Sequence, residues 1–175
     1  RKGVPQLLQA FARLSGEGAS RAWLVVVGSD RKTAAMQSRA QQLGLAGKAL
    51  FPGPQRAINE WYAAADCFVL PTLYDPFPNA ALEAMASGLP VITSTQSGAA
   101  ELLEAGRTGW ACDALDIPAL SHLMASLKPE QAQHMGMEAR NLAEGFPLSD
   151  TAEQLTRLYR RLLGAPQAAA LPRVA

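Results

Sequence analysis

The chain has 175 residues, of which 49% are apolar and 18% charged, and its 16 Lys and Arg nearly balance its 15 Asp and Glu. This composition is too apolar for an intrinsically disordered chain, and the small net charge argues against binding to nucleic acid. No uninterrupted run of about 18 apolar residues is present, so no transmembrane helix is expected.

The spacing of apolar residues, with Gly and Pro as boundaries, predicts helices that alternate with short β-branched strands. In chain order we expect a helix over 4–14, a strand over 23–27, a helix through 36–43, a strand over 49–51, a helix over 58–65, a strand over 67–70, a helix over 80–86 capped by Asn79, a strand over 91–93, a short helix over 100–104, a strand over 109–112, and helices over 117–127, 129–143 and 148–163.

This alternation predicts an α/β fold, a doubly wound (Rossmann-like) parallel sheet with right-handed crossovers and helices on both faces. The strands are continuous apolar runs, as strands buried on both faces are. The length suits one domain of about 100–200 residues. We expect this domain to cover 1–164 and 165–175 to form a flexible tail.

Several common chemistries lack their motifs. Gly16-Glu17-Gly18 precedes a strand instead of following one, so it is not a dinucleotide-binding loop, and no P-loop is present. His122 and His134 have no acidic partners at metal-ligand spacing, and no metal site or cofactor is expected. Cys67 and Cys112 are too few and too far apart for a disulfide scaffold, and indicate reduced thiols of a cytosolic protein.

The loop after the strand at 67–70 contains the most informative pattern. In open α/β sheets, ligands bind at the carboxyl ends of the strands. Asp75 lies in this loop, and Glu83 lies one turn into the following helix. The amides at a helix N-terminus suit a diphosphate, and the two acids can accept hydrogen bonds from sugar and ribose hydroxyls. These three groups occur in that order in a nucleotide sugar.

The residues 75–90, followed by Val91-Ile92-Thr93 and Ser97-Gly98-Ala99-Ala100-Glu101, resemble the signature of retaining glycosyltransferases of the two-Rossmann-domain (GT-B) architecture. That family's pattern is Glu, seven residues, Glu-Ala-Met-Ala-x-Gly-x-Pro-Val-Ile, then Gly-Gly and Glu. Arg1-Lys2-Gly3 is similar to its basic phosphate-binding motif. The resemblance extends over about residues 1–145 and is nearest to lipopolysaccharide core glucosyltransferases.

The resemblance implies a role for each matching residue. Lys2, with Arg1, would neutralise the donor diphosphate, Asp75 would hold the hydroxyls of the transferred sugar, and Glu83 would bind the ribose. The implied catalytic residues are Asp75 and Lys2. The implied donor-binding residues are Arg1, Lys2, Gly53, Pro54, Asp75, Phe77, Asn79, Ala80 and Glu83. Of these, Gly53 and Pro54 would lie at the base pocket, and the backbone amides of 76–79, apart from those of the prolines, would face sugar and phosphate.

Three positions depart from the family pattern. Asp75 stands in place of Glu, Pro78 in place of Gly, and Ser97 in place of the first Gly of the Gly-Gly pair. These changes leave the donor sugar open. No Asp-x-Asp metal motif is present, so Lys2 and the helix amides would stabilise the leaving diphosphate without a metal. No acid is clearly placed as a nucleophile, so the retaining mechanism also stays open.

The expected function is transfer of a hexose, glucose from UDP-glucose, to a sugar hydroxyl such as that of a heptose in the lipopolysaccharide core. The alternatives are a capsule or exopolysaccharide glycosyltransferase with another donor, and a non-catalytic module that binds nucleotide sugars. A doubly wound signalling domain is a third alternative, but it lacks the clustered acids that Mg²⁺-dependent phosphoryl chemistry requires. The expected partners are a nucleotide sugar and a glycan acceptor, and no nucleic acid.

The start of the chain at Arg1 bears on which domains we expect it to contain. We expect a donor-binding fragment whose N-terminal acceptor domain and first central strand are absent, which would leave exposed strand edges. Such a fragment should bind donor weakly and not catalyse transfer alone. The full-length enzyme is expected in the cytoplasm, peripheral at the cytoplasmic face of the inner membrane.

Overall fold

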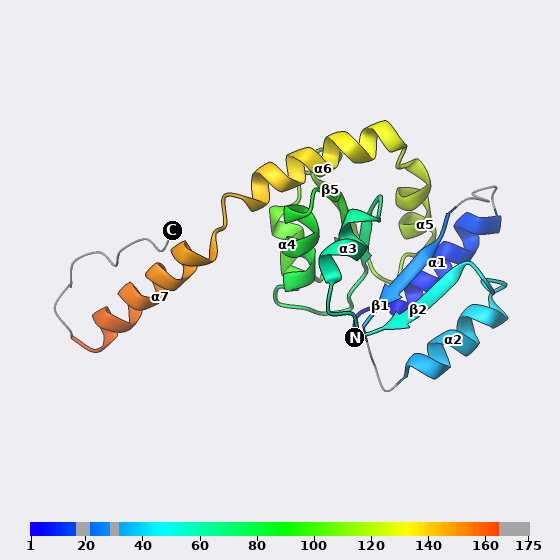
Figure 1. Ribbon diagram of the computed structural model, residues 1–175, viewed down its shortest axis with the longest axis horizontal. Helices are drawn as coiled ribbons and strands as arrows, with labels where there is room; N and C mark the ends of the chain where they lie inside the picture. The colour runs from blue at the N-terminus through cyan, green and yellow to red at the C-terminus, as the bar shows by residue number, and fades with distance from the viewer. Residues whose placement is uncertain (17–21, 29–31, 165–175) are drawn as a thin grey trace.

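The computed structural model describes residues 1–16, 22–28 and 32–164. The predicted tail at 165–175 lies outside the described residues, and so do Gly18, Ser20, Ser29 and Asp30, which follow the predicted helix over 4–14 or the predicted strand over 23–27. The elements, shown in Figure 1, follow in the order α1 (Val4–Gly16), β1 (Leu24–Val27), α2 (Thr33–Gln42), β2 (Ala49–Gly53), α3 (Ile58–Ala63), β3 (Phe68–Leu70), α4 (Asn79–Ala86), β4 (Val91–Ser94), the 3-10 helix η1 (Gly98–Leu102), β5 (Gly109–Cys112), α5 (Ile117–Ser126), α6 (Pro129–Ala143) and α7 (Leu148–Leu162).

Strand β2 differs most from the sequence expectation, because it continues through Pro52 and Gly53, beyond the predicted strand over 49–51. A proline disrupts a central strand because it lacks an N–H group. Within the described residues β2 pairs only with β1, so Pro52 lies in an edge strand, where its missing donor is tolerated. The Gly28 amide donates to the Gly53 carbonyl at 3.0 Å and extends the pairing to the strand end.

The strands form two parallel sheets where the sequence predicts one. Strand β1 pairs with β2, and the other sheet has the order β3-β4-β5. In the described part of the chain, β1 and β3 each pair on one side only, which leaves each with an unpaired edge. Helix α1 joins the two parts: Leu8 packs with Leu24 of β1, and Ala10 packs with Ile92 of β4. The doubly wound α/β class is confirmed.

The centre of the larger sheet is β4, whose four residues are all buried. Successive side chains of a strand point to opposite faces. Val91 packs in a cluster with Tyr62 of α3, Met85 of α4 and Ala139 of α6, whereas Ile92 packs with α1 and α5 on the other face. Helices therefore cover both faces, and the loops at the carboxyl ends of the strands are left for a site.

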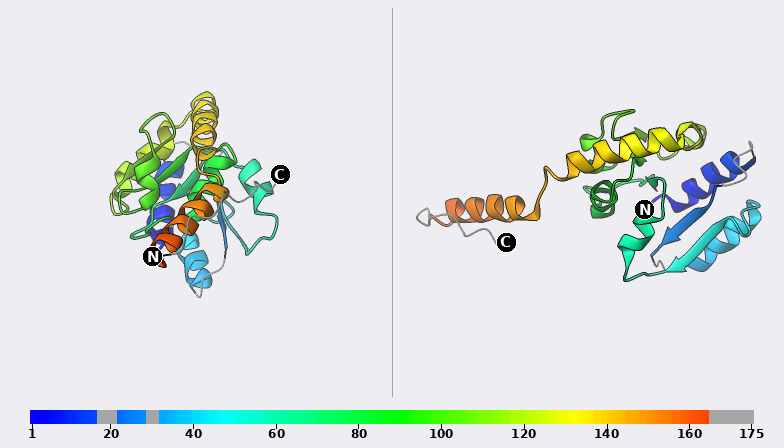
Figure 2. Two further views of the ribbon diagram at one scale, coloured as in Figure 1. Left: turned by 90° about the vertical axis from the view of Figure 1, so that its left-hand side faces the viewer. Right: turned by 45° about the horizontal axis from the view of Figure 1, so that its top comes forward.

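Helix α7 differs from the other helices in its surroundings. Figure 1 and the right-hand view of Figure 2 show it lying apart from the α/β layers, beyond α6. Its apolar residues Leu155, Leu158, Tyr159 and Leu162 are exposed. No helix in the described ranges is long and apolar enough to cross a membrane.

The packing of α4 between β4 and α6 makes Met85 a test of the core. Met85 is fully buried, whereas Met137 on α6 is 54% exposed. We expect Met85→Ala to lower the free energy of unfolding by about 2–5 kcal/mol, because it removes buried contacts and leaves a cavity. The control Met137→Ala should change it by less than about 0.5 kcal/mol. Urea denaturation measures both, and equal losses would contradict this description of the core.

Candidate functional site

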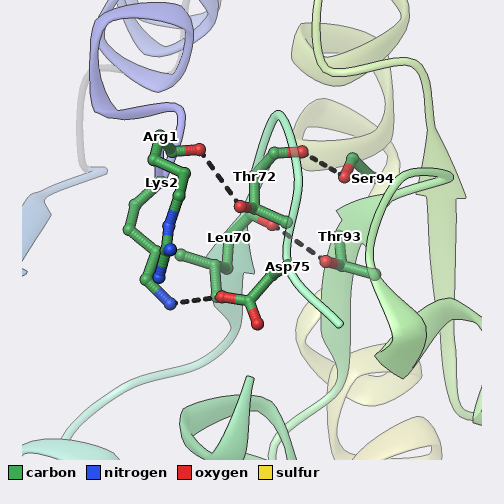
Figure 3. A network of polar contacts seen from close by, with 7 residues as sticks. All are labelled: Arg1, Lys2, Leu70, Thr72, Asp75, Thr93 and Ser94. Carbon is green, nitrogen blue, oxygen red and sulfur yellow. Dashed lines mark hydrogen bonds and ion pairs between the residues drawn. The ribbon is translucent and has the colours of Figure 1, made fainter. Parts of the chain in front are cut away.

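The N-terminal dipeptide and the loop after β3 meet in an ion pair. Lys2 Nζ donates to Asp75 Oδ2 at 2.5 Å, as Figure 3 shows. Asp75 is 6% exposed, whereas the Lys2 side chain is 48% exposed. An ammonium group has three donors, so Lys2 can contact an anion in solvent while it stays paired with Asp75. The structure thus brings together the two residues that the sequence predicts as the charged centre.

This pair determines the charge state of Asp75. The hydrogen bond from Lys2 lowers the pKa of Asp75 below its ordinary value of 3.8, and the charges of Lys2 and Arg1 and the backbone amide of Phe77 lower it further. Burial raises the pKa but is outweighed. Asp75 is therefore an ionised acceptor at neutral pH. The Phe77 amide, which the sequence predicts to face sugar and phosphate, is directed at the Asp75 carboxylate.

Gly3 allows the dipeptide to approach the loop so closely. Its φ is +74°, and a Cβ at this position would lie 1.7 Å from the carbonyl oxygen of Pro71. Only glycine adopts this conformation at this distance without displacing the backbone. The motif Arg1-Lys2-Gly3 thus has a steric reason for its glycine: Gly3 lets the N-terminal dipeptide lie against the loop after β3 immediately before α1 begins at Val4.

Buried hydroxyl groups hold the backbone beneath the ion pair. Thr72 Oγ1 donates to the Arg1 carbonyl at 3.1 Å, and the Leu73 amide donates to the same oxygen at 2.9 Å. Ser94 Oγ donates to the Thr72 carbonyl, and Thr93 Oγ1 donates to the Leu70 carbonyl at 2.9 Å (Figure 3). The chain Ser94–Thr72–Arg1 connects the end of β4 to the N-terminus, so the position of Lys2 depends on two strands.

The backbone of Asp75 is fixed from the opposite side. Its amide donates to the Gln96 carbonyl at 3.2 Å, and its carbonyl accepts from the Gly98 amide at 3.0 Å. A Cβ on Gly98 would lie 1.7 Å from the Pro76 carbonyl oxygen. The second glycine of the family's Gly-Gly pair is therefore sterically required in this chain, whereas Ser97, buried beside it, is accommodated.

The start of α4 differs from the sequence expectation. The sequence predicts Asn79 as the N-cap, but Pro78 occupies that position, with φ −77°, and Asn79 is the first helical residue. The Pro78 carbonyl accepts from the Ala81 amide at 2.9 Å. The N-cap prediction is wrong because it rests on side-chain preference, whereas the fixed φ of proline suits this extended position and no helical N–H is lost there. The departure at Pro78 is thus compatible with the helix start.

The second predicted acid, Glu83, accepts a hydrogen bond from a buried tyrosine. Glu83 is exposed on α4, and its Oε2 accepts from the hydroxyl of Tyr62 at 3.1 Å. Tyr62 is 7% exposed, and its ring packs edge-on against Phe68 with the ring centroids 6.1 Å apart. No pattern in the sequence predicts the contact of the Tyr62 hydroxyl with Glu83.

The remaining predicted site residues come from several elements. Phe77 is 40% exposed, and Asn79 and Arg1 are also exposed. Gly53 is the last residue of β2 in the two-stranded sheet, and its carbonyl accepts a hydrogen bond from the Gly28 amide. Pro54 follows it directly. A hollow of about 540 Å³ lies beside Asp75, between its loop and the segment 95–101. This hollow has room for a sugar ring.

One further result concerns side chains that could bind a metal ion. No group of three or more His, Cys, Asp or Glu side chains that could hold a metal ion is found among residues 1–16, 22–28 and 32–164.

The sequence does not predict the supporting roles of Thr72, Ser94 and Tyr62. The only available signal is that each polar residue occurs within or next to a buried apolar segment, where it needs a hydrogen-bond partner.

The sequence of the chain matches a known protein family and known relatives. The family model described as Glycosyl transferases group 1 matches residues 1–142. The chain is 30% identical to the lipopolysaccharide core biosynthesis mannosyltransferase LpsB of Rhizobium meliloti, over 73% of this chain and 38% of that protein. It is 36% identical to the Vi polysaccharide biosynthesis protein VipC/TviE of Salmonella typhi, over 51% of this chain and 15% of that protein.

A solved structure has the same arrangement of elements. Sucrose-phosphate synthase from Thermosynechococcus elongatus superimposes with a TM-score of 0.83 and 29% identity, over 94% of this chain and 43% of that one. In each of these comparisons the chain spans less than half the length of the relative that it matches.

The ion pair predicts a defined acid titration. The folded pKa of Asp75 lies below its unfolded value of about 3.9, so the stability that the pair contributes is complete above that value and is lost as pH falls through the folded pKa. We expect Lys2→Met to raise the pKa of Asp75 and to reduce this acid-side loss. Carboxyl NMR titration measures the pKa, with Lys128→Met, at the exposed residue that caps the start of α6, as a control. An unchanged pKa in Lys2→Met would contradict the pairing.

Proposed function

The chain belongs to the glycosyl transferases group 1 family and has a GT-B type α/β fold, and on this premise we propose that it forms the donor-binding part of a retaining glycosyltransferase. Residues 1–164 would bind the nucleotide sugar, and a separate domain would bind the acceptor. The whole enzyme would transfer a hexose, glucose from UDP-glucose, to a sugar hydroxyl.

The observation that carries this proposal is the Lys2–Asp75 pair. In the proposed transfer, the bond between the anomeric carbon and the diphosphate oxygen breaks and that oxygen takes the electron pair. The acceptor oxygen bonds to the carbon and releases its proton. Negative charge develops on the diphosphate, so a positive group placed there lowers the barrier. Lys2 has donors left for this role, and Asp75 is an ionised acceptor for sugar hydroxyls.

The other residues complete the proposed donor site. Glu83 would bind the ribose hydroxyls, and Arg1 would add positive charge at the diphosphate. Pro76 and Pro78 have no amide hydrogen and the Phe77 amide is directed at Asp75, so the Asn79 amide would be the phosphate donor at the start of α4. Gly53, Pro54, Phe77 and Ala80 would line the base and sugar pockets. We propose that no metal takes part, because an ammonium group already lies where the diphosphate would bind.

The names of the relatives support two kinds of acceptor. A relative named as a lipopolysaccharide core mannosyltransferase supports transfer to the lipopolysaccharide core, which is our first proposal. A relative named as a Vi polysaccharide biosynthesis protein supports a capsule or exopolysaccharide glycosyltransferase as the second. Both acceptors would place the enzyme in the cytoplasm, peripheral at the inner membrane. The mannosyltransferase name also makes a guanosine-linked mannose the competing donor.

Calorimetry with UDP-glucose, UDP-galactose and GDP-mannose tests the proposal. We expect the 175-residue chain to bind UDP-glucose more tightly than the other two. Tighter binding of GDP-mannose would replace the proposed donor, and no binding to any of them would overturn the function. If the full-length protein binds a donor but transfers no sugar, the chain is a nucleotide-sugar binding module instead.

Two substitutions test the site itself. We expect Lys2→Ala and Glu83→Ala each to weaken UDP-glucose binding by more than about tenfold, since each removes a charged hydrogen-bonding partner of the ligand. Lys128→Ala and Glu130→Ala, both on the exposed start of α6, are the matched controls and should leave the affinity unchanged. If Lys2→Ala and Glu83→Ala bind donor as well as the wild type does, the site is misplaced.

A further inference from the structure

Tyr62 combines a buried ring with a hydroxyl group that contacts an exposed side chain. Its ring is held in the cluster beneath α4 and against the edge of Phe68, so it has little freedom to move. Its hydroxyl donates to Glu83 Oε2 at 3.1 Å and lies 3.4 Å from the carbonyl oxygen of Ala80, in the first turn of α4. A rigid donor therefore contacts an acid that is itself exposed.

An exposed glutamate on a helix samples several rotamers, and fixing one of them for a ligand costs conformational entropy. A hydrogen bond to Oε2 restricts the side chain before any ligand arrives. Each carboxylate oxygen accepts more than one hydrogen bond, so Oε1 and the rest of Oε2 stay available to a ligand. The carboxylate can thus be oriented by Tyr62 and still bind a diol.

The Tyr62 hydroxyl stays protonated, so it remains a hydrogen-bond donor to Glu83. Burial, and then the charge of Glu83 and the hydrogen bond to it, raise the pKa of Tyr62 to about 12. The hydroxyl therefore keeps its proton throughout the neutral range.

We propose that Tyr62 is a positioning residue that holds the Glu83 carboxylate in the orientation that binds the 2′- and 3′-hydroxyls of the ribose of a nucleoside diphosphate. This inference rests on the proposed function, because it assigns Glu83 to the ribose. It adds a residue from α3 to a site that is otherwise built from the N-terminal dipeptide, the end of β2, the loop after β3 and helix α4. Tyr62 itself does not touch the ligand.

The test compares UDP with 2′,3′-dideoxy-UDP by calorimetry in the full 175-residue chain. We expect Tyr62→Phe to weaken UDP binding by about three- to tenfold, the effect of one hydrogen bond, and to leave dideoxy-UDP binding unchanged. Phenylalanine keeps the ring packing, and the freed carboxylate is exposed to water, so the melting temperature should stay close to that of the wild type. Tyr159→Phe, on exposed α7, is the matched control.

A second arm uses Glu83→Ala as the background. Adding Tyr62→Phe to Glu83→Ala should cause no further loss of UDP affinity, because the positioned group is gone. An equal loss for both ligands, or a further loss in the Glu83→Ala background, would show a merely structural role and overturn the inference. Unchanged UDP affinity in Tyr62→Phe would overturn it too. Absence of UDP binding by the wild type would overturn the proposed function, and this inference with it.

Discussion

The ion pair between Lys2 and Asp75 is the interaction on which the site depends. A cation just before a helix is disfavoured by the positive end of the helix dipole, by about 0.3–1 kcal/mol at exposed sites. The buried carboxylate of Asp75 offsets this at α1, and Lys2 in turn neutralises a carboxylate that burial alone would disfavour. Each charge therefore makes the other tolerable, and together they place a positive group and an ionised acceptor side by side.

Backbone contacts fix the geometry of the Lys2–Asp75 pair, in addition to the contact between the two side chains. Gly3 brings the N-terminus within contact of the loop after β3, and the hydroxyls of Thr72 and Ser94 tie that loop to the N-terminus and to β4. On the other side, the segment 96–98 binds both backbone groups of Asp75. A charged pair held in this way is oriented before a ligand binds, which reduces the entropy lost on binding.

The two-sheet architecture explains how one helix serves both parts of the fold. Helix α1 packs with β1 through Leu8 and with β4 through Ala10, so one helix contacts both sheets. The loops after β2 and β3 belong to different sheets, yet both supply predicted donor-binding residues. The relative position of these loops therefore depends on the apolar packing of α1 and not on a continuous ladder of hydrogen bonds.

The sequence by itself determined the α/β class, the order of the elements and the candidate acids, because apolar spacing, Gly and Pro boundaries and the 75–90 motif are all local patterns. Only the tertiary structure decided the contacts between distant residues. Lys2 meets Asp75 across 73 positions and Tyr62 meets Glu83 across 21, and no local pattern encodes such pairs. The division into two sheets and the replacement of Asn79 by Pro78 as N-cap were likewise decided by backbone packing, which outweighs the local preferences of single residues.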